Sequence, residues 1–441
     1  MTTPPTLTRR DRARVVTAST VGTTIEFYDF YIYATATVAV FPYLFFPKSE
    51  NPTIGLLASF ATFGLAFLAR PLGSIVFGHF GDVIGRKATL VFALLTMGIA
   101  TFLIGLLPTY HQIGIAAPAL LALMRFCQGL GLGGEWSGAA LLATETAEEG
   151  KRAWAAMWPQ LGAPFGFLLA NGLFLILVTA FDYTNGDMDN AFMVWGWRIP
   201  FLASAVMVAV GLYVRLRLEE TPVFQQAIDQ NKRVSSPLKE VFRTAARPLV
   251  IGTFVMVGCY TLFYLVTTWI LSYGINEHGL QFEYTAFLKL QLISIFAFIA
   301  GVPLSGWLAD KFGRRPTLLW VTVAMIVFSA SFSLFLHQQT ATTGSVLAFL
   351  TIGMFLMGLI FGPMSAVLPE LFPTNVRYTG SGISYNVASI LGAAIAPFIA
   401  TALAANYGVT YVGLYLGVVS AVSLVAILVM RETREQDMTT I

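Results

Sequence analysis

Residues 78–87 read GHFGDVIGRK and residues 306–315 read GWLADKFGRR, so a charged decapeptide recurs 228 positions further along the chain. Both copies belong to a longer pattern, G-x4-G-x3-D-x2-G-R-[K/R], which starts at Gly73 in the first copy and at Gly301 in the second. Glu145 precedes Arg152 by seven residues after the fourth apolar run, and Glu370 precedes Arg377 by seven after the tenth. These repeats predict a structural unit that the chain uses two times.

The composition predicts a membrane protein. The chain has 441 residues, of which 56% are hydrophobic and only 11% are charged, whereas about 25% of the residues in an ordinary soluble domain are charged. The net charge of +3 comes from dispersed basic residues, which excludes a continuous basic face for nucleic acid. Neither Cys127 nor Cys259 has a second cysteine or a histidine at metal-ligand spacing, so we expect no metal site and no cofactor.

Twelve segments are long and apolar enough to cross a bilayer as helices, which takes about 20 residues each. The fold class predicted from them is an all-α polytopic membrane protein with two bundles of six helices. The predicted segments are 15–46, 53–80, 88–107, 114–144, 153–180, 191–214, 249–274, 284–309, 317–336, 344–368, 379–404 and 409–430.

The distribution of basic residues predicts that both termini are cytoplasmic. In that orientation all of the 26 lysines and arginines lie on the cytoplasmic side except Lys48, Arg70, Arg125, Arg198 and Lys289. The polar stretch between the sixth and seventh segments divides the chain. The predicted organisation is a cytoplasmic tail (1–14), a first bundle (15–216), a cytoplasmic linker (217–247), a second bundle (248–430) and a cytoplasmic tail (431–441).

The repeated loops resemble the signature loops of the major facilitator superfamily. Together with FYDFYIY, RPLGSIVFGHFGD, RFCQGLGLGGEWSGAALL and WGWRIPF, they resemble the metabolite:proton symporter branch, which includes carriers of shikimate, ketoglutarate, citrate and proline or betaine. The resemblance extends over nearly the whole chain and implies a multi-pass protein of the bacterial inner membrane. It implies no particular substrate.

The repeated charged residues are predicted to form a cytoplasmic gate that holds the two halves together in one state and releases them in another. Each aspartate can pair with the arginine that follows it and face the positive N-terminal end of a neighbouring helix. The alternative is a mere anchor of the topology. The predicted gate residues are Gly78, Asp82, Gly85, Arg86, Lys87, Glu145, Arg152, Gly306, Asp310, Gly313, Arg314, Arg315, Glu370 and Arg377.

Ionisable residues inside the predicted spans give the sharpest functional signal, because each costs about 2.5 to 3.5 kcal/mol to insert and usually faces a cavity. Glu26 and Asp29 lie one turn apart in the first span, and Arg125 lies in the fourth with Glu135 on a broadly shared face. Asp29 and Arg125 resemble the acid of helix 1 and the arginine of helix 4 in proton-coupled relatives. We predict that these four residues couple transport to protons.

The expected chemistry is an exchange of partners at Arg125. A guanidinium stabilises an ionised carboxylate whereas burial favours the neutral acid, so a change in the distance between Arg125 and Asp29 would change the proton affinity. The planar guanidinium suits two-point binding of a substrate carboxylate, which would compete with Asp29. The alternatives are a permanent ion pair between helices 1 and 4, Glu26 as the proton site, and a helix contact for Glu135.

The remaining candidates are polar and aromatic side chains that can line a cavity, although each is also compatible with helix packing. With Arg125 they form the predicted substrate site: Tyr33, Gln128, Trp158, Gln160, Tyr260, Tyr264, Gln291, Tyr385 and Asn386. Arg70 is expected to pair with a carboxylate at a helix end instead of binding substrate. The glycines of GLGLGG, at 129–134, match a dinucleotide-binding spacing but lie inside a span, which favours helix packing.

These observations predict a proton-coupled importer of a small polar metabolite, with a carboxylate-bearing organic acid as the favoured class, that works by alternating access as a monomer. Its partners are the small-molecule substrate, the proton and the lipid bilayer. The alternatives are a carrier of a zwitterionic compatible solute and a membrane sensor with the same fold. An enzyme is not expected, because no nucleophile with a base and no metal-ligand set occurs.

Overall fold

The structure is a computed structural model that describes residues 9–48, 50–84, 86–133, 136–145, 147–148, 150–216, 237–373 and 376–435. Every regular element in these ranges is a helix, as the apolar runs predict. The helices of the first half are α1 (Arg9–Ala39), α2 (Phe41–Leu44), α3 (Pro52–Ile84), α4 (Arg86–Ile104), α5 (Tyr110–Ile113), α6 (Ala116–Leu132), α7 (Trp136–Glu145), α8 (Arg152–Gln160), α9 (Gly162–Ala180), α10 (Ala191–Val194), η1 (Gly196–Arg198) and α11 (Ile199–Leu216).

The second half begins after the polar stretch and contains two π-helical turns, η2 and η3, which interrupt long helices. Such turns occur frequently at functional sites. Its helices are α13 (Pro237–Thr244), α14 (Ala246–Tyr264), η2 (Leu265–Trp269), α15 (Ile270–Ile275), α16 (Tyr284–Phe312), α17 (Arg314–Ser329), α18 (Phe332–Leu336), α19 (Thr343–Phe361), α20 (Met364–Glu370), α21 (Arg377–Ser389), η3 (Ile390–Ala394), α22 (Ala396–Tyr407) and α23 (Val409–Val429).

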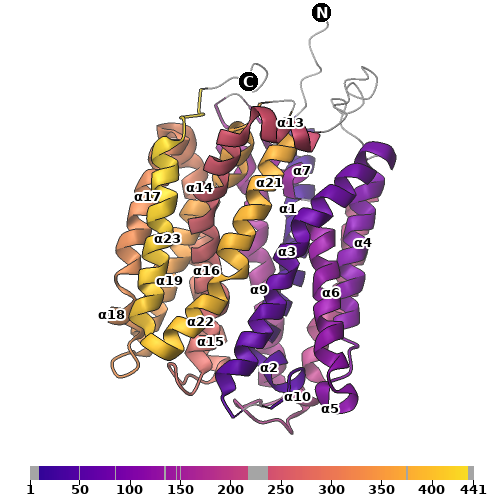
Figure 1. The fold of residues 1–441 in the computed structure, drawn as a ribbon, viewed down its shortest axis with the longest axis vertical. Coiled ribbons are helices and arrows are strands. Elements are labelled where there is room, and N and C mark those ends of the chain that lie inside the picture. Colours follow the sequence, from indigo (N-terminus) through magenta and orange to yellow (C-terminus); the bar gives the residue numbers. More distant parts are fainter. Residues whose placement is uncertain are drawn as a thin grey trace, which may run out of the picture.

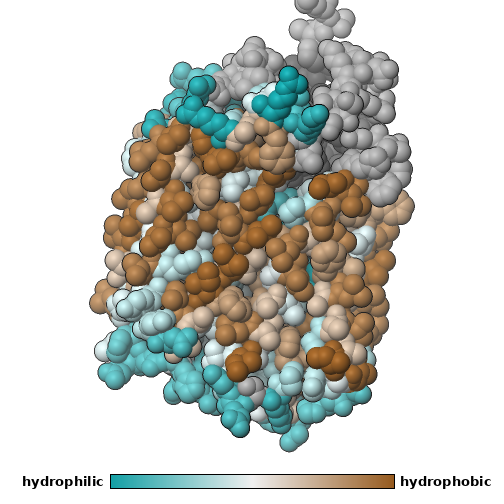
Figure 2. Space-filling view, in the orientation of Figure 1, coloured by the Kyte–Doolittle hydropathy of each residue, from teal (hydrophilic) through white to brown (hydrophobic). Residues whose placement is uncertain are grey.

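Helices occupy each of the twelve predicted segments. Among the described residues, eight helical stretches are long and apolar enough to cross a membrane, and 91–104 and 116–132 form shorter apolar helices. The count of twelve spans therefore stays a prediction. Figure 2 shows a broad hydrophobic band across the visible face of the molecule with hydrophilic residues toward its two ends, as expected for a protein that lies in a bilayer.

The helices of the two halves stand side by side, with the first half in indigo to magenta and the second in red through orange to yellow (Figure 1). We call the face where α1 begins and α23 ends the terminal face, and the other the opposite face. The first half meets the second through α3, which packs on η3 and α22, and through α8 and α9, which pack on α16.

The sequence repeat reappears as a repeat in helix packing. A Cβ atom on Gly73 of α3 would overlap the backbone of Leu130 on α6, and a Cβ on Gly301 of α16 would lie 2.7 Å from the carbonyl oxygen of Phe355 on α19. Gly129 of the GLGLGG stretch approaches the backbone of Ala66 in the same way. These glycines are thus required for close contact between helices, which agrees with the packing interpretation.

Candidate functional site

The guanidinium of Arg125 on α6 lies at the centre of the candidate site. Its side chain is 0% exposed; Nε donates to the carbonyl of Phe63 at 3.2 Å, and Nη1 donates to Gln128 Oε1 at 3.0 Å. The ring centres of Phe30 and Tyr33 lie 4.6 and 4.1 Å from the guanidinium carbon, which stabilises a cation. Nη2 and the Tyr33 hydroxyl have no hydrogen-bond partner in the described chain. Two buried donors are therefore open to an acceptor such as a carboxylate.

A series of side-chain hydrogen bonds connects Arg125 to Asp29, which is 1% exposed on α1. Gln128 Nε2 donates to Thr101 Oγ1 at 2.7 Å, and the Thr101 hydroxyl lies 3.3 Å from Asp29 Oδ2. Ser204 of α11 donates to the other carboxyl oxygen, Oδ1, at 2.7 Å. We call Arg125, Gln128, Thr101 and Asp29 the relay. It joins three helices of the first half.

The expected direct contact between Asp29 and Arg125 is not formed in this structure. No ion pair joins them among the described residues. Gln128 lies one turn after Arg125 on the same helix and takes the hydrogen bond from Nη1, while two hydroxyls satisfy the carboxyl group. The arginine and the acid are therefore linked indirectly.

Four aromatic rings next to Arg125 form a compact group, the aromatic cluster, which consists of Phe30, Phe63, Phe67 and Tyr264. All six distances between their ring centres are 5.2 to 5.7 Å, with the rings edge to face. Tyr264 comes from α14 and therefore inserts a ring of the second half among three rings of the first. The cluster thus joins the halves beside the relay.

Arg70 on α3 also packs on the aromatic cluster, and its position differs from the expected one. Its side chain is 5% exposed, and its guanidinium carbon lies 4.9 Å from the Phe67 ring centre and 5.5 Å from that of Phe30. No hydrogen bond or ion pair of Arg70 exists in the described chain, and Nε is buried without an acceptor. Because α3 continues to Ile84, Arg70 lies well inside the helix and not at its end.

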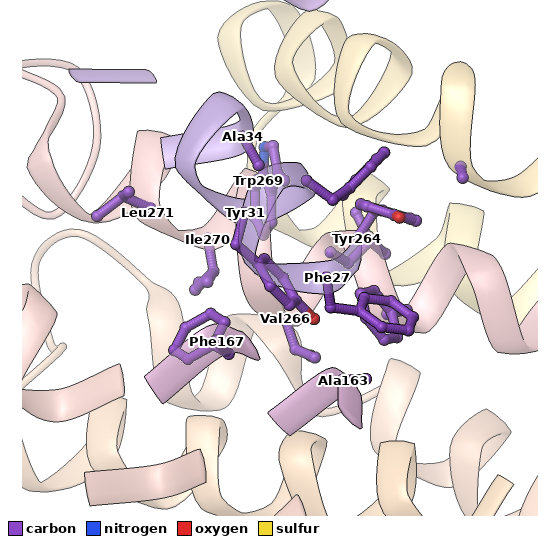
Figure 3. Close-up of a cluster of buried hydrophobic side chains, with 14 of the residues drawn as sticks. Phe27, Tyr31, Ala34, Ala163, Phe167, Tyr264, Val266, Trp269, Ile270 and Leu271 are labelled. Carbon is purple, nitrogen blue, oxygen red and sulfur yellow. The ribbon is translucent and has the colours of Figure 1, made fainter. Parts of the chain in front are cut away.

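Aromatic residues of α1 fill the space between the halves. The Tyr31 ring contacts Phe167 of α9 at 5.0 Å and Phe263 of α14 at 5.9 Å, and the Phe27 ring contacts Phe263 at 6.0 Å. In Figure 3, Phe27 and Tyr31 lie among Tyr264, Phe167 and Val266, which belong to both halves. The Tyr31 hydroxyl is buried without a partner in the described chain. This layer therefore offers a polar atom in an otherwise apolar contact.

The structure buries two of the predicted glutamines between helices but leaves Trp158 outside. Gln291 donates to the carbonyl of Thr267 in η2 at 2.9 Å, and its own oxygen is buried without a donor. Gln160 donates to the carbonyl of Phe361 at 2.9 Å and so connects α8 to α19. Trp158 is 38% exposed, which places it away from the buried site because its helix turns that face outward.

The predicted residues of α14 and α21 lie between the aromatic cluster and the terminal face. The Tyr385 ring stacks on Trp136 with centres 3.7 Å apart and contacts the Tyr260 ring at 5.2 Å. Asn386 donates to Ser74 Oγ of α3 at 2.8 Å. Because Trp136 and Ser74 belong to the first half, this group forms a second contact between the halves.

Predicted gate residues of the second half come together at the terminal face. Asp310 accepts hydrogen bonds from the backbone N–H groups of Ala153 and Trp154, at 3.0 and 2.8 Å, and so caps the start of α8. Arg314 pairs with Asp310 at 3.0 Å and grips Glu370 with Nε and Nη2 at 3.1 and 3.0 Å. We call these residues, with Arg152, the terminal-face network.

Arg152 extends the network across the halves. Its Nη1 lies 3.4 Å from Glu370, and its Nη2 donates to the carbonyl of Arg434 at 2.8 Å. Thr433 donates to Glu370 at 2.6 Å, and the backbone N–H of Arg314 donates to Glu432 at 3.0 Å. The segment after α23 therefore takes part in the contact.

The other predicted gate residues of this half have separate roles. A Cβ on Gly306 would lie 2.9 Å from Met157, so this glycine permits the approach of α16 to α8. Gly313 adopts a φ of 107° in the turn between α16 and α17, which favours glycine. Arg315 donates to two carbonyls near the end of α23, and Arg377 donates to the carbonyl of Phe372 at 3.3 Å.

Several predicted residues cannot be placed. The following lie outside the described residues or have side chains that are not described: Gly78, Asp82, Gly85, Arg86, Lys87, Glu135 and Glu145. Glu26 is 6% exposed on α1, one turn before Phe30. Thr101 and Ser204 were missed, because single hydroxyls in apolar runs show no pattern in sequence.

The halves also meet at the opposite face. Asn185, in the loop after α9, donates to the carbonyl of Phe282 at 3.0 Å and accepts from the backbone N–H of Tyr284 at 2.9 Å. The relay and the aromatic cluster therefore lie between two sets of contacts, one at each face. Such an arrangement encloses a central site.

Comparison with known proteins identifies the family. The model of the Major Facilitator Superfamily matches residues 21–390. The chain belongs to this superfamily. It is 52% identical over 97% of its length to the inner membrane metabolite transport protein YhjE of Escherichia coli, and covers 96% of that protein. The family and its relatives are membrane transporters and not enzymes, and the location is the inner membrane, as predicted.

More distant members of the superfamily differ in what they are named for. The chain is 34% identical to the shikimate transporter of Escherichia coli, over 96% of this chain and 95% of that protein. It is 31% identical to the proline/betaine transporter of the same species, over 96% of this chain and 84% of that protein. A solved structure of the proton:xylose symporter XylE has a TM-score of 0.71 with 17% identity, and the match covers 96% of each chain. This last match confirms the fold.

Proposed function

We propose that this transporter imports a small metabolite with a carboxylate together with a proton, by alternating access and as a monomer. The terminal face is cytoplasmic in this proposal, and the two six-helix bundles, 15–216 and 248–430, move relative to each other. The observation that carries the proposal is the relay, in which a fully buried arginine with an open donor is linked to a buried acid.

Burial explains why the open donor favours an anion. A buried cation is costly unless hydrogen bonds and a counter-charge compensate for the lost water. Arg125 has partners for Nε and Nη1 but none for Nη2 in the described chain, and the Tyr33 hydroxyl nearby is also open. A carboxylate accepts from both donors and supplies the counter-charge.

The relay offers a route by which anion binding changes the proton affinity of Asp29. The Thr101 hydroxyl has one hydrogen and lies 2.9 Å from the carbonyl of Met97 and 3.3 Å from Asp29. It can donate to the ionised carboxylate, or donate to Met97 and accept from the protonated acid. An anion that draws Nη1 away from Gln128 releases the amide that holds Thr101, which favours the second arrangement. Proton uptake then offsets the charge of the anion.

The aromatic cluster favours a second candidate, a zwitterionic compatible solute. Aromatic faces bind quaternary ammonium groups, and a 31% identical relative is named for proline and betaine. In that case the carboxylate would bind Arg125 and the ammonium would face rings of the cluster. The shikimate transporter is a slightly more similar relative, and the cluster already contacts two guanidinium groups, which favours the acid.

Proteoliposomes that contain a pH-sensitive dye test both candidates. Shikimate, succinate or betaine is added outside, with and without an imposed membrane potential. Proton entry driven by shikimate and insensitive to the potential supports one anion with one proton. Entry driven by betaine that increases with an inside-negative potential, at about 2.3 kcal/mol per charge per 100 mV, supports the zwitterion. If none of these compounds drives proton entry, both candidates are contradicted.

A further inference from the structure

We propose that Arg70 forms a second anion-binding station, through which the cargo carboxylate passes between Arg125 and the terminal face. This inference rests on the proposed function, because it takes the cargo to be an anion. Its starting point is that Arg70 is 5% exposed and has no hydrogen-bond acceptor or ion pair in the described chain.

The lack of partners distinguishes Arg70 from another arginine outside the predicted cytoplasmic side. Arg198 donates to the carbonyls of Gly105 and Leu107 at 3.0 and 2.6 Å, as expected for an arginine that ties helix ends together. The Arg70 guanidinium, in contrast, lies over two ring faces and has no hydrogen bond or ion pair among the described groups. Stacking on rings leaves the edge of a guanidinium open, and this edge carries the donors that bind a carboxylate in two-point fashion.

The two stations follow one another along α3. Arg125 donates to the carbonyl of Phe63, and Arg70 comes seven residues later, about 10 Å along a helix at 1.5 Å per residue. Both guanidinium carbons lie over the Phe30 ring, at 4.6 and 5.5 Å, so they are no more than about 10 Å apart, the sum of these distances. The aromatic cluster separates them. Movement of Tyr264 with the second half would join the two stations.

Polar aromatic groups continue from Arg70 toward the terminal face. The rings of Tyr264, Tyr260 and Tyr385 follow one another, with centres 6.4 and 5.2 Å apart, and the Tyr260 side chain is buried. One turn after Arg70, Ser74 accepts a hydrogen bond from Asn386. Hydroxyl and amide donors therefore lie beside the route that an anion would follow.

Each station also has an acid on α1. Asp29 is linked to Arg125 by the relay, and Glu26 lies one turn before Phe30, the ring on which Arg70 packs. Each arginine is thus close to a carboxyl group when no cargo is bound. The ligand class that fits the second station is a small carboxylate.

Transport from each face separates the two stations. Right-side-out and inside-out vesicles with the full chain are compared for shikimate entry, using R70Q, R70K, R125Q and, as the matched control, R198Q. We expect R70Q to raise the KM measured from the terminal face about tenfold or more, because a charged hydrogen bond is lost. The KM measured from the opposite face should rise less than about threefold. R70K recovers part of the loss, R198Q changes neither KM, and R125Q fails from both faces. An unchanged terminal-face KM in R70Q overturns the second station, as does an equal rise from both faces.

Binding without transport gives an independent test. The melting temperature of the purified chain is measured with benzoate as the anion. Two stations predict that R125Q keeps a benzoate-dependent increase which the double variant R70Q/R125Q loses. If R125Q shows no increase, the second station is overturned even if transport occurs. If the increase is present but no carboxylate is transported, the proposed function fails and the station stands.

Discussion

Arg314 and Glu370 of the terminal-face network are about as buried as Arg125 and Arg70 beside the aromatic cluster, yet the two arginine environments are satisfied to very different degrees. Arg314 is 1% exposed and uses Nε, Nη1 and Nη2 in bonds to carbonyl and carboxyl oxygens. Within the described chain, Arg125 leaves Nη2 open and Arg70 has only ring contacts. The first region is built to hold two halves together, whereas the second keeps binding capacity unused.

The largest expected effect is on the stability of the network. Replacement of Arg314 by Gln leaves Glu370 buried without its main partner, and removal of one member of a buried pair costs about 3 to 5 kcal/mol. We expect a correspondingly lower free energy of unfolding in denaturant titrations of the purified chain. The matched control is Lys151→Gln, because Lys151 pairs with Glu148 on the surface with side chains 64% and 54% exposed, and such pairs contribute less than about 1 kcal/mol. If both substitutions lower the free energy of unfolding equally, the buried network is no more stabilising than a surface ion pair, and the contrast between the two regions is lost.

Replacement of Arg125 by Gln is expected to reduce transport without reducing stability, in contrast to the replacement of Arg314. Uptake of the carboxylate falls roughly a hundredfold, as expected for the loss of a buried charge contact, while the melting temperature does not decrease, because the removed charge was incompletely compensated. Radiolabelled uptake and thermal unfolding of the same preparation provide the two values. A melting temperature as low as that of the Arg314 variant would assign Arg125 a structural role and contradict the proposal.

Replacement of Asp29 by Asn is expected to separate binding from coupling. Asn preserves the shape of the side chain and can still accept a hydrogen bond from Ser204, but it cannot take up a proton. The variant should exchange labelled for unlabelled substrate, yet its accumulation ratio should fall about tenfold, which corresponds to about 1.4 kcal/mol of lost driving force. Wild-type uptake should increase as the outside becomes more acidic, and uptake by the variant should not. If an Asp29→Asn variant still concentrates substrate, the proton site is another acid, and Glu26 is the next to test.

The smallest expected effect concerns the relay itself. Thr101→Val keeps the shape of the side chain but removes the hydroxyl between Gln128 and Asp29, and one neutral hydrogen bond contributes about 0.5 to 1.5 kcal/mol. We expect the pH dependence of uptake to weaken with roughly a two- to tenfold loss of accumulation, on the order that this energy allows. The matched control is Thr96→Val, since Thr96 bonds only to the carbonyl of Phe92 on its own helix among the described groups. If both variants behave like the wild type, anion and proton are coupled by another route.

Much of the fold could be predicted from the sequence because membrane helices are encoded locally. Apolar runs of sufficient length predicted helices that the structure contains, and the repeated motif predicted residues that meet at the terminal face, such as Asp310, Arg314 and Glu370. Whether those residues act as a gate stays a prediction. The exposure of Trp158 and the ring contacts of Arg70 could not be predicted, because the orientation of one helix face depends on the neighbours that cover it.

The sequence by itself thus determined that this chain forms apolar helices and repeats a charged motif, and it predicted Asp29 and Arg125 as charges inside spans, because length, periodicity and insertion cost act on each segment separately. Only the tertiary structure decided which groups these charges meet. Gln128 and Thr101 stand between them, and Arg70 lies on the rings of Phe30 and Phe67. These contacts join side chains from α1, α3, α4 and α6, so they depend on the relative depth and rotation of packed helices, which no single segment specifies.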